Sequence, residues 1–301
     1  MATRPESVRV FAPAKINLFL HVERKRRDGY HDLQSLVAFA DIGDELTVAR
    51  ADGFSLALDG PFAHLLSGEP DNLVLKAARS LAAHLASRDG AHFTLTKNLP
   101  VASGIGGGSA DAAAALRGLL ALWKRDDADA DQLNALAAAL GSDIPVCLRS
   151  RPAWMEGRGE RVLHLPLLPR AGLVLVNPGV AVSTADVFRR VVPDMRDAGM
   201  KPPGEFGTLD ELVRYLGTTR NDLEASARAI APVIGEALDA LSRHGAAFAR
   251  MSGSGATCFG LFKTDAQAHA AAASIAQAQP AWWARAGGFA IAEAGDAHSA
   301  A

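Results

Sequence analysis

The chain has 301 residues, of which 49% are hydrophobic and 21% are charged. These proportions are close to those of globular proteins, and they exclude a disordered, collagen-like or coiled-coil chain. Thirty-one basic and thirty-three acidic side chains leave a net charge of −2, so the composition gives no electrostatic argument for a nucleic-acid partner. We expect a soluble, cytoplasmic protein, because no segment has the pattern of a signal peptide or of a membrane span.

The two cysteines, Cys147 and Cys258, lie far apart in apolar runs. Their spacing excludes a zinc ribbon and a dithiol redox site. We expect both thiols to be buried in a protein of a reducing compartment. The sequence shows no cluster with metal-ligand spacing, so no protein metal site is predicted.

In the first half, alternating patterns predict strands and four-residue spacing of apolar residues predicts helices. Pro13 is expected to separate the first two strands, and the sequence Asp-Ile-Gly-Asp at 41–44 is expected to form a turn. The expected strands are 8–11, 16–22, 33–40, 45–50, 54–58 and 92–96, and the expected helices are 71–86, 109–122 and 131–140.

The second half begins after Pro166 and Pro169, which mark a domain joint. The expected elements are a strand at 172–176, a short helix capped by Ser183 or Thr184, helices at 209–216 and 221–241, strands at 247–251 and 257–262, a helix at 265–277 and a strand at 289–291. Without the inserted helices this order is β-α-β-β-α-β, a ferredoxin-like arrangement. We therefore expect domains at 1–165 and 166–293, followed by a flexible tail at 294–301.

A glycine-rich segment at 99–111 leads directly into a helix and is the strongest local signal. Four glycines between Gly104 and Gly108 remove side chains just before a helix N-terminus, where free N–H groups and the helix dipole favour a phosphate chain. Ser103 and Ser109 can add hydroxyl donors. A flexible loop with Ser109 as an ordinary N-cap explains the same residues about as well. The P-loop pattern is absent, and the Rossmann pattern fits poorly.

Lys15 and Asn17 lie two residues apart in an apolar strand, so they share one face of it. A lysine in such a strand needs a negative partner or a solvent-exposed position. On this observation alone, an edge-strand lysine that prevents aggregation is a better explanation than catalysis.

Two further segments carry polar residues at expected element boundaries. Asp143 follows a helix end and precedes Pro145, so it either caps a short helix or presents its carboxylate to a cleft. The segment 250–257 contains Gly253 and Gly255 between two strands, which is typical of a hairpin turn and also suits closure over phosphates.

These four segments, in this order and at these distances, resemble the GHMP kinase superfamily, which includes galactokinase, homoserine kinase and mevalonate kinase. The likeness extends from about Phe11 to Ile291. It is greatest to members whose acceptor is a cytidine diphosphate-linked methylerythritol of the non-mevalonate isoprenoid precursor pathway. The segments that carry this closer likeness are Ala14–Leu18, Arg27–Gln34, Gly141–Pro145, Asn177–Gly179 and Asn221–Glu224.

The resemblance implies an α+β fold of two domains, the first like domain 2 of ribosomal protein S5 and the second ferredoxin-like, with the active site between them. It implies ATP-dependent phosphorylation of the acceptor's 2-hydroxyl, with Mg²⁺ arriving on the ATP phosphates. The implied partner is this small molecule, with no nucleic acid or membrane, and the implied state is a monomer or weak homodimer.

The resemblance also implies roles for particular residues. Lys15 and Asp143 would be the catalytic pair. The residues implied for ATP are Lys97, Asn98, Pro100, Ser103, Gly104, Gly106, Gly107, Gly108 and Ser109, and those implied for the acceptor are Asn17, Tyr30, His31, Asp143, Thr184 and Phe188. Tyr30 and Phe188 would stack on the cytosine, and His31 would hydrogen-bond to it. Ser103 departs from the family pattern, which has a smaller residue there.

Two other functions remain open at this point. One is a different small-molecule kinase of the same superfamily, of the homoserine or mevalonate type. The other is a non-catalytic protein that binds a nucleotide or RNA through the S5-like half. A tyrosine that merely packs on its own hairpin is likewise an alternative to a cytosine-stacking role for Tyr30.

Overall fold

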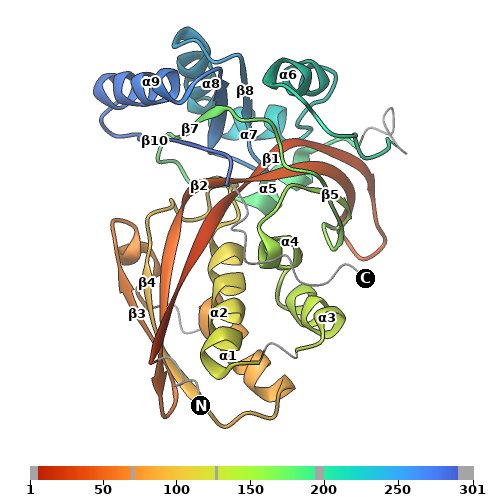
Figure 1. Cartoon of the computed structure of the whole chain (residues 1–301). Coiled ribbons are helices and arrows are strands. Elements are labelled where there is room, and N and C mark those ends of the chain that lie inside the picture. The colour runs from red at the N-terminus through yellow and green to blue at the C-terminus, as the bar shows by residue number, and fades with distance from the viewer. Residues whose placement is uncertain (1–5, 69–71, 126–127, 194–199, 291–301) are drawn as a thin grey trace.

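The computed structural model describes residues 6–68, 72–125, 128–193 and 200–290. A long antiparallel pair, β1 (Ser7–Lys25) and β2 (His31–Ala51), runs through most of the molecule (Figure 1). The other edge of β2 pairs with β4 (Gly90–Thr96) along one stretch and with β5 (Ala153–Gly157) along another. The sheet is completed by β3 (Phe54–Asp59) beside β4 and β6 (Arg161–His164) beside β5.

Both long strands are continuous at positions where the sequence predicted interruptions, so those two predictions are wrong. Pro13 pairs with Gly43, and the register shifts between Pro13 and Lys15. Proline is tolerated at such an irregularity because no ladder hydrogen bond is required from it there. The segment 41–44 is extended strand rather than turn. The strands β5 and β6 were not expected from the sequence.

Helices cover one face of this first sheet and enclose an apolar core with it. They are α1 (Leu73–His84), α2 (Gly107–Trp123), α3 (Ala130–Leu140) and α4 (Ile144–Arg149), with a short 3-10 helix, η1 (Ala63–Leu66), beside β3. The side chain of Asn72 caps α1 by accepting a hydrogen bond from the N–H of Val74. Residue 71, where the sequence places the start of this helix, lies outside the described residues.

The second half has a four-stranded antiparallel sheet with the strand order β10-β7-β9-β8. Its strands are β7 (Gly172–Asn177), β8 (Phe248–Met251), β9 (Cys258–Phe262) and β10 (Trp283–Gly288). Its helices are α5 (Thr184–Arg190), α6 (Leu209–Gly217), α7 (Glu224–Ile230), α8 (Val233–Arg243) and α9 (Asp265–Ala278). The β-α-β-β-α-β order and the ferredoxin-like expectation are confirmed.

Two expected boundaries in this half are wrong. The helix expected at 221–241 is two helices. Pro232 lies between α7 and α8, and it has no backbone N–H to donate to a helical hydrogen bond. The closing strand is 283–288; of the expected 289–291, Phe289 forms an isolated bridge with Ala40, and residue 291 lies outside the described residues. We retain 1–165 and 166–293 as a proposed domain division, and the expected tail, 294–301, lies outside the described residues.

The two sheets share an apolar layer, which joins the halves of the chain. Ile16 and Leu18 of β1 enter this layer from one side, and Leu175 and Phe259 of β7 and β9 enter it from the other. All four side chains are fully buried. The burial of this much apolar surface favours a fixed arrangement of the two halves.

Two backbone connections reinforce this joint at the end of β10. The N–H of Gly288 donates to the carboxylate of Asp41 at 2.7 Å, and the N–H of Ala290 donates to the carbonyl of Phe39 at 2.7 Å. Both acceptors belong to β2. The second half is therefore tied to the central strand of the first sheet by directional bonds as well as by apolar packing.

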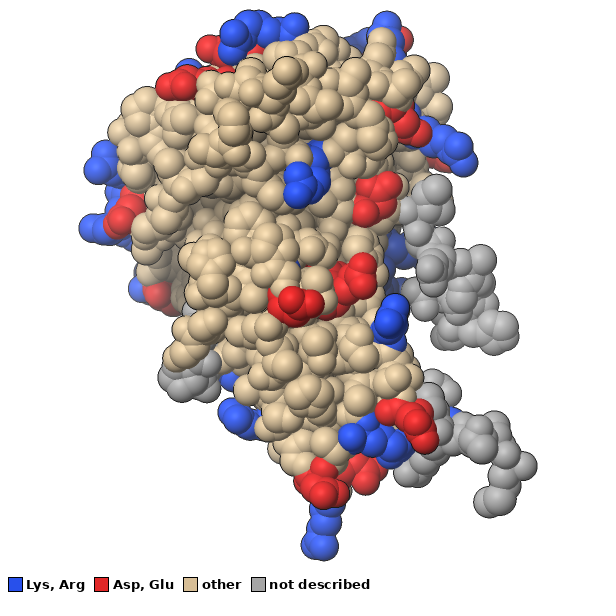
Figure 2. All heavy atoms as spheres, turned by 90° about the vertical axis from the view of Figure 1, so that its left-hand side faces the viewer, with Lys and Arg blue, Asp and Glu red and all other residues tan. Residues whose placement is uncertain are grey.

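Charged side chains are scattered over the face shown in Figure 2, with both signs present and a broad uncharged area between them. This pattern agrees with the small net charge. Both cysteines are buried and free, as expected. Within the described ranges, no helix is both long enough and apolar enough to cross a bilayer.

The shared layer gives a stability prediction. Phe259→Ala removes a fully buried ring between the sheets and should lower the free energy of unfolding by about 3–5 kcal/mol, because it leaves a cavity as well as losing burial. Urea titration monitored by circular dichroism measures the change. Phe11→Ala is the matched control, since that ring is 42% exposed, and equal losses in the two variants would contradict the prediction.

Candidate active site

A cavity of about 780 Å³ is lined by residues from both halves of the chain. Its walls come from β1, the glycine-rich segment, the start of α4, the first turns of α5 and the loop between β8 and β9. Of the residues that the sequence singled out, those that line it are Lys15, Asn17, Tyr30, His31, Lys97, Pro100, Ser103, Gly104, Gly106, Gly107, Gly108, Ser109, Asp143, Thr184 and Phe188. Asn98 does not line it.

Lys15 and Asp143 meet in this cavity, although 128 positions separate them in the sequence. The Nζ atom of Lys15 donates to Oδ2 of Asp143 at 2.8 Å. The lysine side chain is 5% exposed, and the aspartate side chain is 36% exposed. The alternative of a solvated edge-strand lysine is therefore wrong, because the ammonium group is buried against a carboxylate that still faces the cavity.

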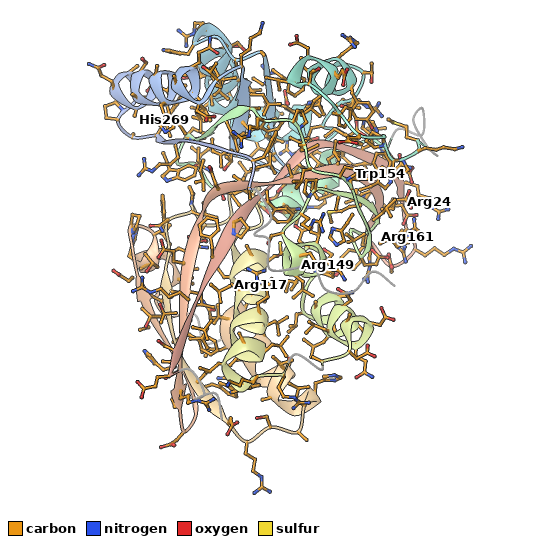
Figure 3. The ribbon with its side chains drawn as sticks, viewed as in Figure 1. Arg24, Arg117, Arg149, Trp154, Arg161 and His269 are labelled. Atoms are coloured by element: carbon orange, nitrogen blue, oxygen red, sulfur yellow. The ribbon has the colours of Figure 1, made fainter. Side chains whose placement is uncertain are left out.

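The position of Asp143 follows from the way α4 begins. Asp143 is the N-cap residue, but its side chain makes no capping hydrogen bond, and Pro145 occupies the first turn. The carboxylate is thus left for Lys15. Arg117 of α2 donates to the carbonyl oxygens of Cys147 in α4 and Phe11 in β1 (Figure 3), which fixes α4 against the strand that carries Lys15.

The glycine-rich segment enters α2 earlier than expected, since the helix starts at Gly107 and Ser109 lies in its first turn. Gly106 has a φ of 64° and packs against Lys15, so that a Cβ atom there would lie 3.2 Å from the lysine side chain. The first N–H groups of a helix have no acceptor within the helix. Here they border the cavity beside a lysine, which makes this helix start a suitable anion site.

A second glycine loop, 252–255, fits against the first. Gly104 has a φ of 78°, and a Cβ atom on it would lie 2.5 Å from the carbonyl oxygen of Ser252. A Cβ atom on Gly253 would lie 2.7 Å from the carbonyl oxygen of Gly104. The hairpin interpretation of 250–257 is correct. The turn of this hairpin also packs against the glycine-rich segment that is the candidate phosphate site. Ser103 satisfies its hydroxyl inside the first loop by donating to the carbonyl of Pro100 at 2.6 Å.

Beneath these loops lies a buried group of three charges. Nζ of Lys97 donates to Asp44 at 2.5 Å and to Asp111 at 2.6 Å, and all three side chains are nearly inaccessible to solvent. Asp44 also accepts from the N–H groups of Asn98 and Leu99. The ammonium group of Lys97 is therefore held by carboxylates at the wall of the cavity, and a role for it toward adenine stays a prediction.

Burial and the neighbouring charges both shift the pKa values in this group. Burial lowers the pKa of Lys97, but the charges of Asp111 and Asp44 outweigh it and raise that pKa above its ordinary value. The pKa of Asp111 is raised from 3.8 to about 7, because burial and the negative charge of Asp44 together outweigh the opposite effect of Lys97. A single lysine thus cannot fully compensate two buried carboxylates.

The other end of the cavity is aromatic. His31 and Phe188 stack with their ring centroids 5.1 Å apart and an interplanar angle of 29°. Burial, with the positive charge of Lys25, lowers the pKa of His31. The imidazole is therefore neutral at pH 7, with one donor nitrogen and one acceptor nitrogen.

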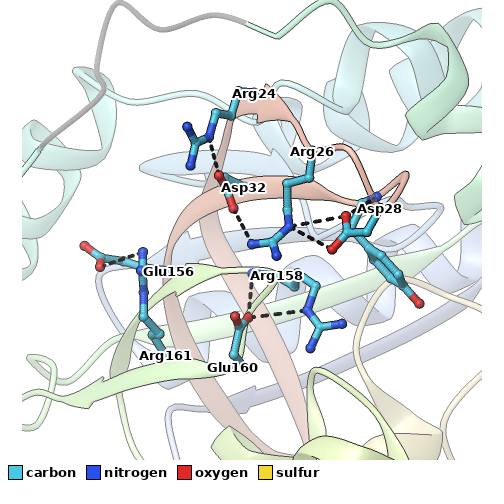
Figure 4. Close-up of polar contacts among 9 residues, drawn as sticks. Arg24, Arg26, Asp28, Asp32, Glu156, Arg158, Glu160 and Arg161 are labelled. Atoms are coloured by element: carbon cyan, nitrogen blue, oxygen red, sulfur yellow. Dashed lines mark hydrogen bonds and ion pairs between the residues drawn. The ribbon is translucent and has the colours of Figure 1, made fainter.

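Tyr30 is held at the rim of the cavity by the turn before it. Arg26 pairs with Asp28, and Asp28 accepts from the N–H of Tyr30 (Figure 4). Tyr30 is 56% exposed, and the guanidinium of Arg158 lies 5.2 Å from the centroid of its ring. A tyrosine packed on its own hairpin is thus not what the structure shows.

Asn17 and Thr184 lie between the two ends. The amide of Asn17 donates from Nδ2 to the hydroxyl of Ser35 at 2.8 Å, and its backbone N–H donates to the hydroxyl of Ser252 at 3.1 Å. The hydroxyls of Thr184 and Ser254 are 2.8 Å apart. Each side chain is therefore oriented by a neighbour that sequence reasoning did not include.

Sequence reasoning also missed Asp44, Asp111 and Arg158. One signal was present for the first two, because a lysine in an apolar setting requires a negative partner, and Asp44 and Asp111 interrupt apolar runs. No local pattern indicated Arg158, which is brought to the cavity by the unexpected β5–β6 hairpin.

Comparisons with known proteins agree with this geometry. The family model described as GHMP kinases N terminal domain matches residues 72–151, and the one described as GHMP kinases C terminal matches residues 203–281. A protein of Parvibaculum lavamentivorans named 4-diphosphocytidyl-2-C-methyl-D-erythritol kinase is 54% identical over 90% of this chain and 94% of its own length. One of the same name from Paracoccus denitrificans is 51% identical over 94% of this chain and 97% of its own length.

Solved structures give the same result. A crystal structure of 4-(cytidine 5'-diphospho)-2C-methyl-D-erythritol kinase superposes with a TM-score of 0.77 at 33% identity, covering 94% of this chain and all of that one. A homoserine kinase from Cytophaga hutchinsonii superposes with a TM-score of 0.73 at 17% identity, covering 97% and 96% of the two chains. The second likeness concerns the fold alone.

The raised pKa of Asp111 gives a prediction for stability against pH. Between pH 3.8 and about 7 the folded protein holds a proton on Asp111 that the unfolded chain has released, so this group destabilises the fold progressively as pH rises through that window. Asp111→Asn lacks this penalty. The variant should therefore gain stability relative to wild type as pH rises: its free energy of unfolding minus that of wild type should be larger at pH 8 than at pH 5.

Urea titrations of both proteins at the two pH values measure this difference. Asp239→Asn is the control for removal of a carboxylate, since Asp239 is exposed on α8. A difference for Asp111→Asn that is constant, or that is larger at pH 5, would show that the buried carboxylate does not titrate in this way.

Proposed function

The chain belongs to the GHMP kinase superfamily and, within it, to the 4-diphosphocytidyl-2-C-methyl-D-erythritol kinase family, and from this we propose how its residues carry out the reaction. The reaction is transfer of the γ-phosphoryl group of ATP to the 2-hydroxyl group of 4-diphosphocytidyl-2-C-methyl-D-erythritol. The observation that carries the proposal is the contact between Lys15 and Asp143 in a cavity that is also lined by the N-terminus of α2 and by His31.

The glycine-rich end of the cavity is proposed to bind the triphosphate. The N–H groups at Gly107, Gly108 and Ser109 and the positive end of the α2 dipole favour phosphate oxygens. Because Gly104 and Gly106 have no side chains, the second glycine loop and Lys15 approach the segment closely. Pro100 and Ser103 shape its outer wall, and Lys97 and Asn98 remain candidates for the adenine side.

The catalytic step is proposed to depend on Lys15 and Asp143. Phosphoryl transfer has a loose transition state, so positioning and charge neutralisation matter more than strong base catalysis. Asp143 orients the attacking hydroxyl and accepts its proton late, as the oxygen–phosphorus bond forms, because a carboxylate is a far weaker base than an alkoxide. The ammonium of Lys15 offsets the negative charge on the γ-phosphoryl oxygens and on the attacking oxygen.

Mg²⁺ is proposed to enter with ATP. Magnesium commonly keeps water ligands and binds through substrate phosphates with one or two protein oxygens. This fits the residues present, since no group of three His, Cys, Asp or Glu side chains suited to a metal occurs among the described residues. Among the oxygens that line the cavity, the hydroxyl of Ser109 and the carboxylate of Asp143 are the proposed candidates to hold it. When bound, Mg²⁺ neutralises phosphate charge.

The aromatic end is proposed to recognise the cytosine. Cytosine presents an exocyclic amine beside an acceptor nitrogen and a carbonyl, and one nitrogen of a neutral His31, an acceptor or a donor, can hydrogen-bond to one of these groups. The rings of Tyr30 and Phe188 offer stacking faces, which contribute about 1–3 kcal/mol per base in single-stranded nucleic acids. Asn17 and Thr184 are then proposed to contact the part of the substrate between the cytosine and the 2-hydroxyl group that is phosphorylated.

The finer cellular features are also proposals. The small net charge and the two unpaired, buried cysteines support a cytoplasmic enzyme that acts on a dissolved small molecule rather than on nucleic acid. A monomer or weak homodimer is proposed for its state in solution.

A coupled assay of ADP release tests the function directly. The expected result is ATP turnover that depends on 4-diphosphocytidyl-2-C-methyl-D-erythritol and is absent with mevalonate or homoserine. Turnover with mevalonate or homoserine instead would establish another activity of the superfamily. Failure of all three acceptors while ATP still binds would favour a non-catalytic nucleotide-binding protein.

Asp143→Asn tests the base. The variant keeps the shape of the side chain but cannot accept the proton, so kcat should fall by about 10²–10⁴-fold with little change in the affinity for either substrate. Steady-state kinetics and calorimetric titration with CDP measure the two effects. Asp239→Asn on α8 is the control for removal of a carboxylate, and near-normal turnover by Asp143→Asn would exclude the proposed proton acceptor.

His31→Ala tests base recognition. Without the imidazole, the preference for CDP over UDP as competitive inhibitors should fall by about 5–100-fold, which corresponds to the loss of hydrogen bonds worth about 1–3 kcal/mol. Inhibition constants for the two nucleotides measure the preference. His92→Ala is a matched control on β4, outside the cavity lining, and an unchanged preference in His31→Ala would move cytosine recognition to other residues.

A further inference from the structure

The loop between β8 and β9 contacts both ends of the cavity within three residues. At the phosphate end, the hydroxyl of Ser252 donates to the carbonyl of Gly104 at 3.0 Å and accepts from the N–H of Asn17. Gly253 presses on the same carbonyl, with no room for a Cβ atom. These contacts fix one end of the loop against the proposed triphosphate site.

The loop is also held from behind. The side-chain amide of Asn221 donates from Nδ2 to the carbonyls of Met251 and Gly253, each at 2.8 Å. The N–H of Ser252 donates to the carbonyl of Thr257, and that of Thr257 donates to the carbonyl of Ser103. A residue carried by this loop therefore has a well-defined position relative to both halves of the chain.

Ser254 is the residue that reaches the acceptor end. It is 8% exposed, and its hydroxyl oxygen lies 2.8 Å from that of Thr184, the first residue of α5. This helix has seven residues, and Val187 is the one that is fully buried. Four residues after Thr184, Phe188 stacks on His31. The Ser254 contact therefore anchors the N-terminal end of a short helix that carries an aromatic side chain of the acceptor end.

We propose that Ser254 is a positioning residue that orients the hydroxyl of Thr184 toward the diphosphate of the acceptor and holds α5 over the cytidine end. The proposal rests on the proposed function. Each hydroxyl has one hydrogen, so an anionic oxygen in the cavity favours donation from Ser254 to Thr184 and from Thr184 to the ligand. Without Ser254, Thr184 loses the donor that directs its own hydrogen into the cavity.

Calorimetric titration with CDP and, separately, with ADP tests this role. Ser254→Ala should weaken CDP binding by about 3–10-fold, the loss expected for one hydrogen bond, with ADP binding changed less than about 2-fold. In a Thr184→Val background, Ser254→Ala should cause no further loss, because the partner of the hydroxyl is already absent. Ser254→Thr retains the hydroxyl and should restore CDP affinity.

The controls separate this role from general damage. Ser242→Ala removes an exposed serine hydroxyl on α8 and should bind both nucleotides like wild type. Ser254→Cys keeps the size of the side chain and serves as the folded substitute if Ser254→Ala melts at a much lower temperature, with the same selective loss of CDP affinity expected.

The outcomes that overturn the proposal are distinct from failure of the proposed function. Wild-type CDP affinity in Ser254→Ala or Ser254→Cys, equal weakening of CDP and ADP, or a full further loss in the Thr184→Val background would each reject the positioning role. If wild type itself neither binds CDP nor phosphorylates the cytidine-linked acceptor, the proposed function fails instead.

Discussion

The alternation of side chains along β1 is the constraint on which the site depends. Ile16 and Leu18 enter the apolar layer that the two sheets share, so Lys15 and Asn17 must face the cavity. A slip of one residue would exchange the two sets and bury an ammonium group in an apolar layer. The same packing that joins the two halves therefore sets the direction of the lysine that meets Asp143.

Rigidity at the phosphate end has two physical sources. Steric fit between Gly104 and Gly253 excludes side chains from the contact of the two loops. Below them, Lys97 holds Asp44 and Asp111 together, and breaking such a buried group leaves an uncompensated charge. The protein thus maintains an electrostatically costly arrangement beneath the segment where precise backbone geometry matters most.

The sequence was sufficient for what local pattern encodes. The presence of a helix directly after the glycine-rich segment, although it begins at Gly107 rather than at 109, the ferredoxin-like order and the shared face of Lys15 and Asn17 all follow from spacing. It could not show that β2 continues through 41–44, because distant partners hold this stretch: Gly43 and Asp44 pair with β1, and Asp41 accepts from the N–H of Gly288. The contacts of Ser252 with Asn17 and Gly104 could not be predicted from local pattern either, since they join residues that are 235 and 148 positions apart in the sequence.

The unbroken course of β2 has a consequence for how substrates enter and products leave. This strand holds Asp44 beneath the proposed ATP site and Asp41 against Gly288 of the second half. A bending motion between the halves would have to break the hydrogen bonds from Gly288 to Asp41 and from Ala290 to Phe39 and open the layer around Phe259. This joint therefore opposes hinge opening between the two halves of the chain during substrate entry and product release.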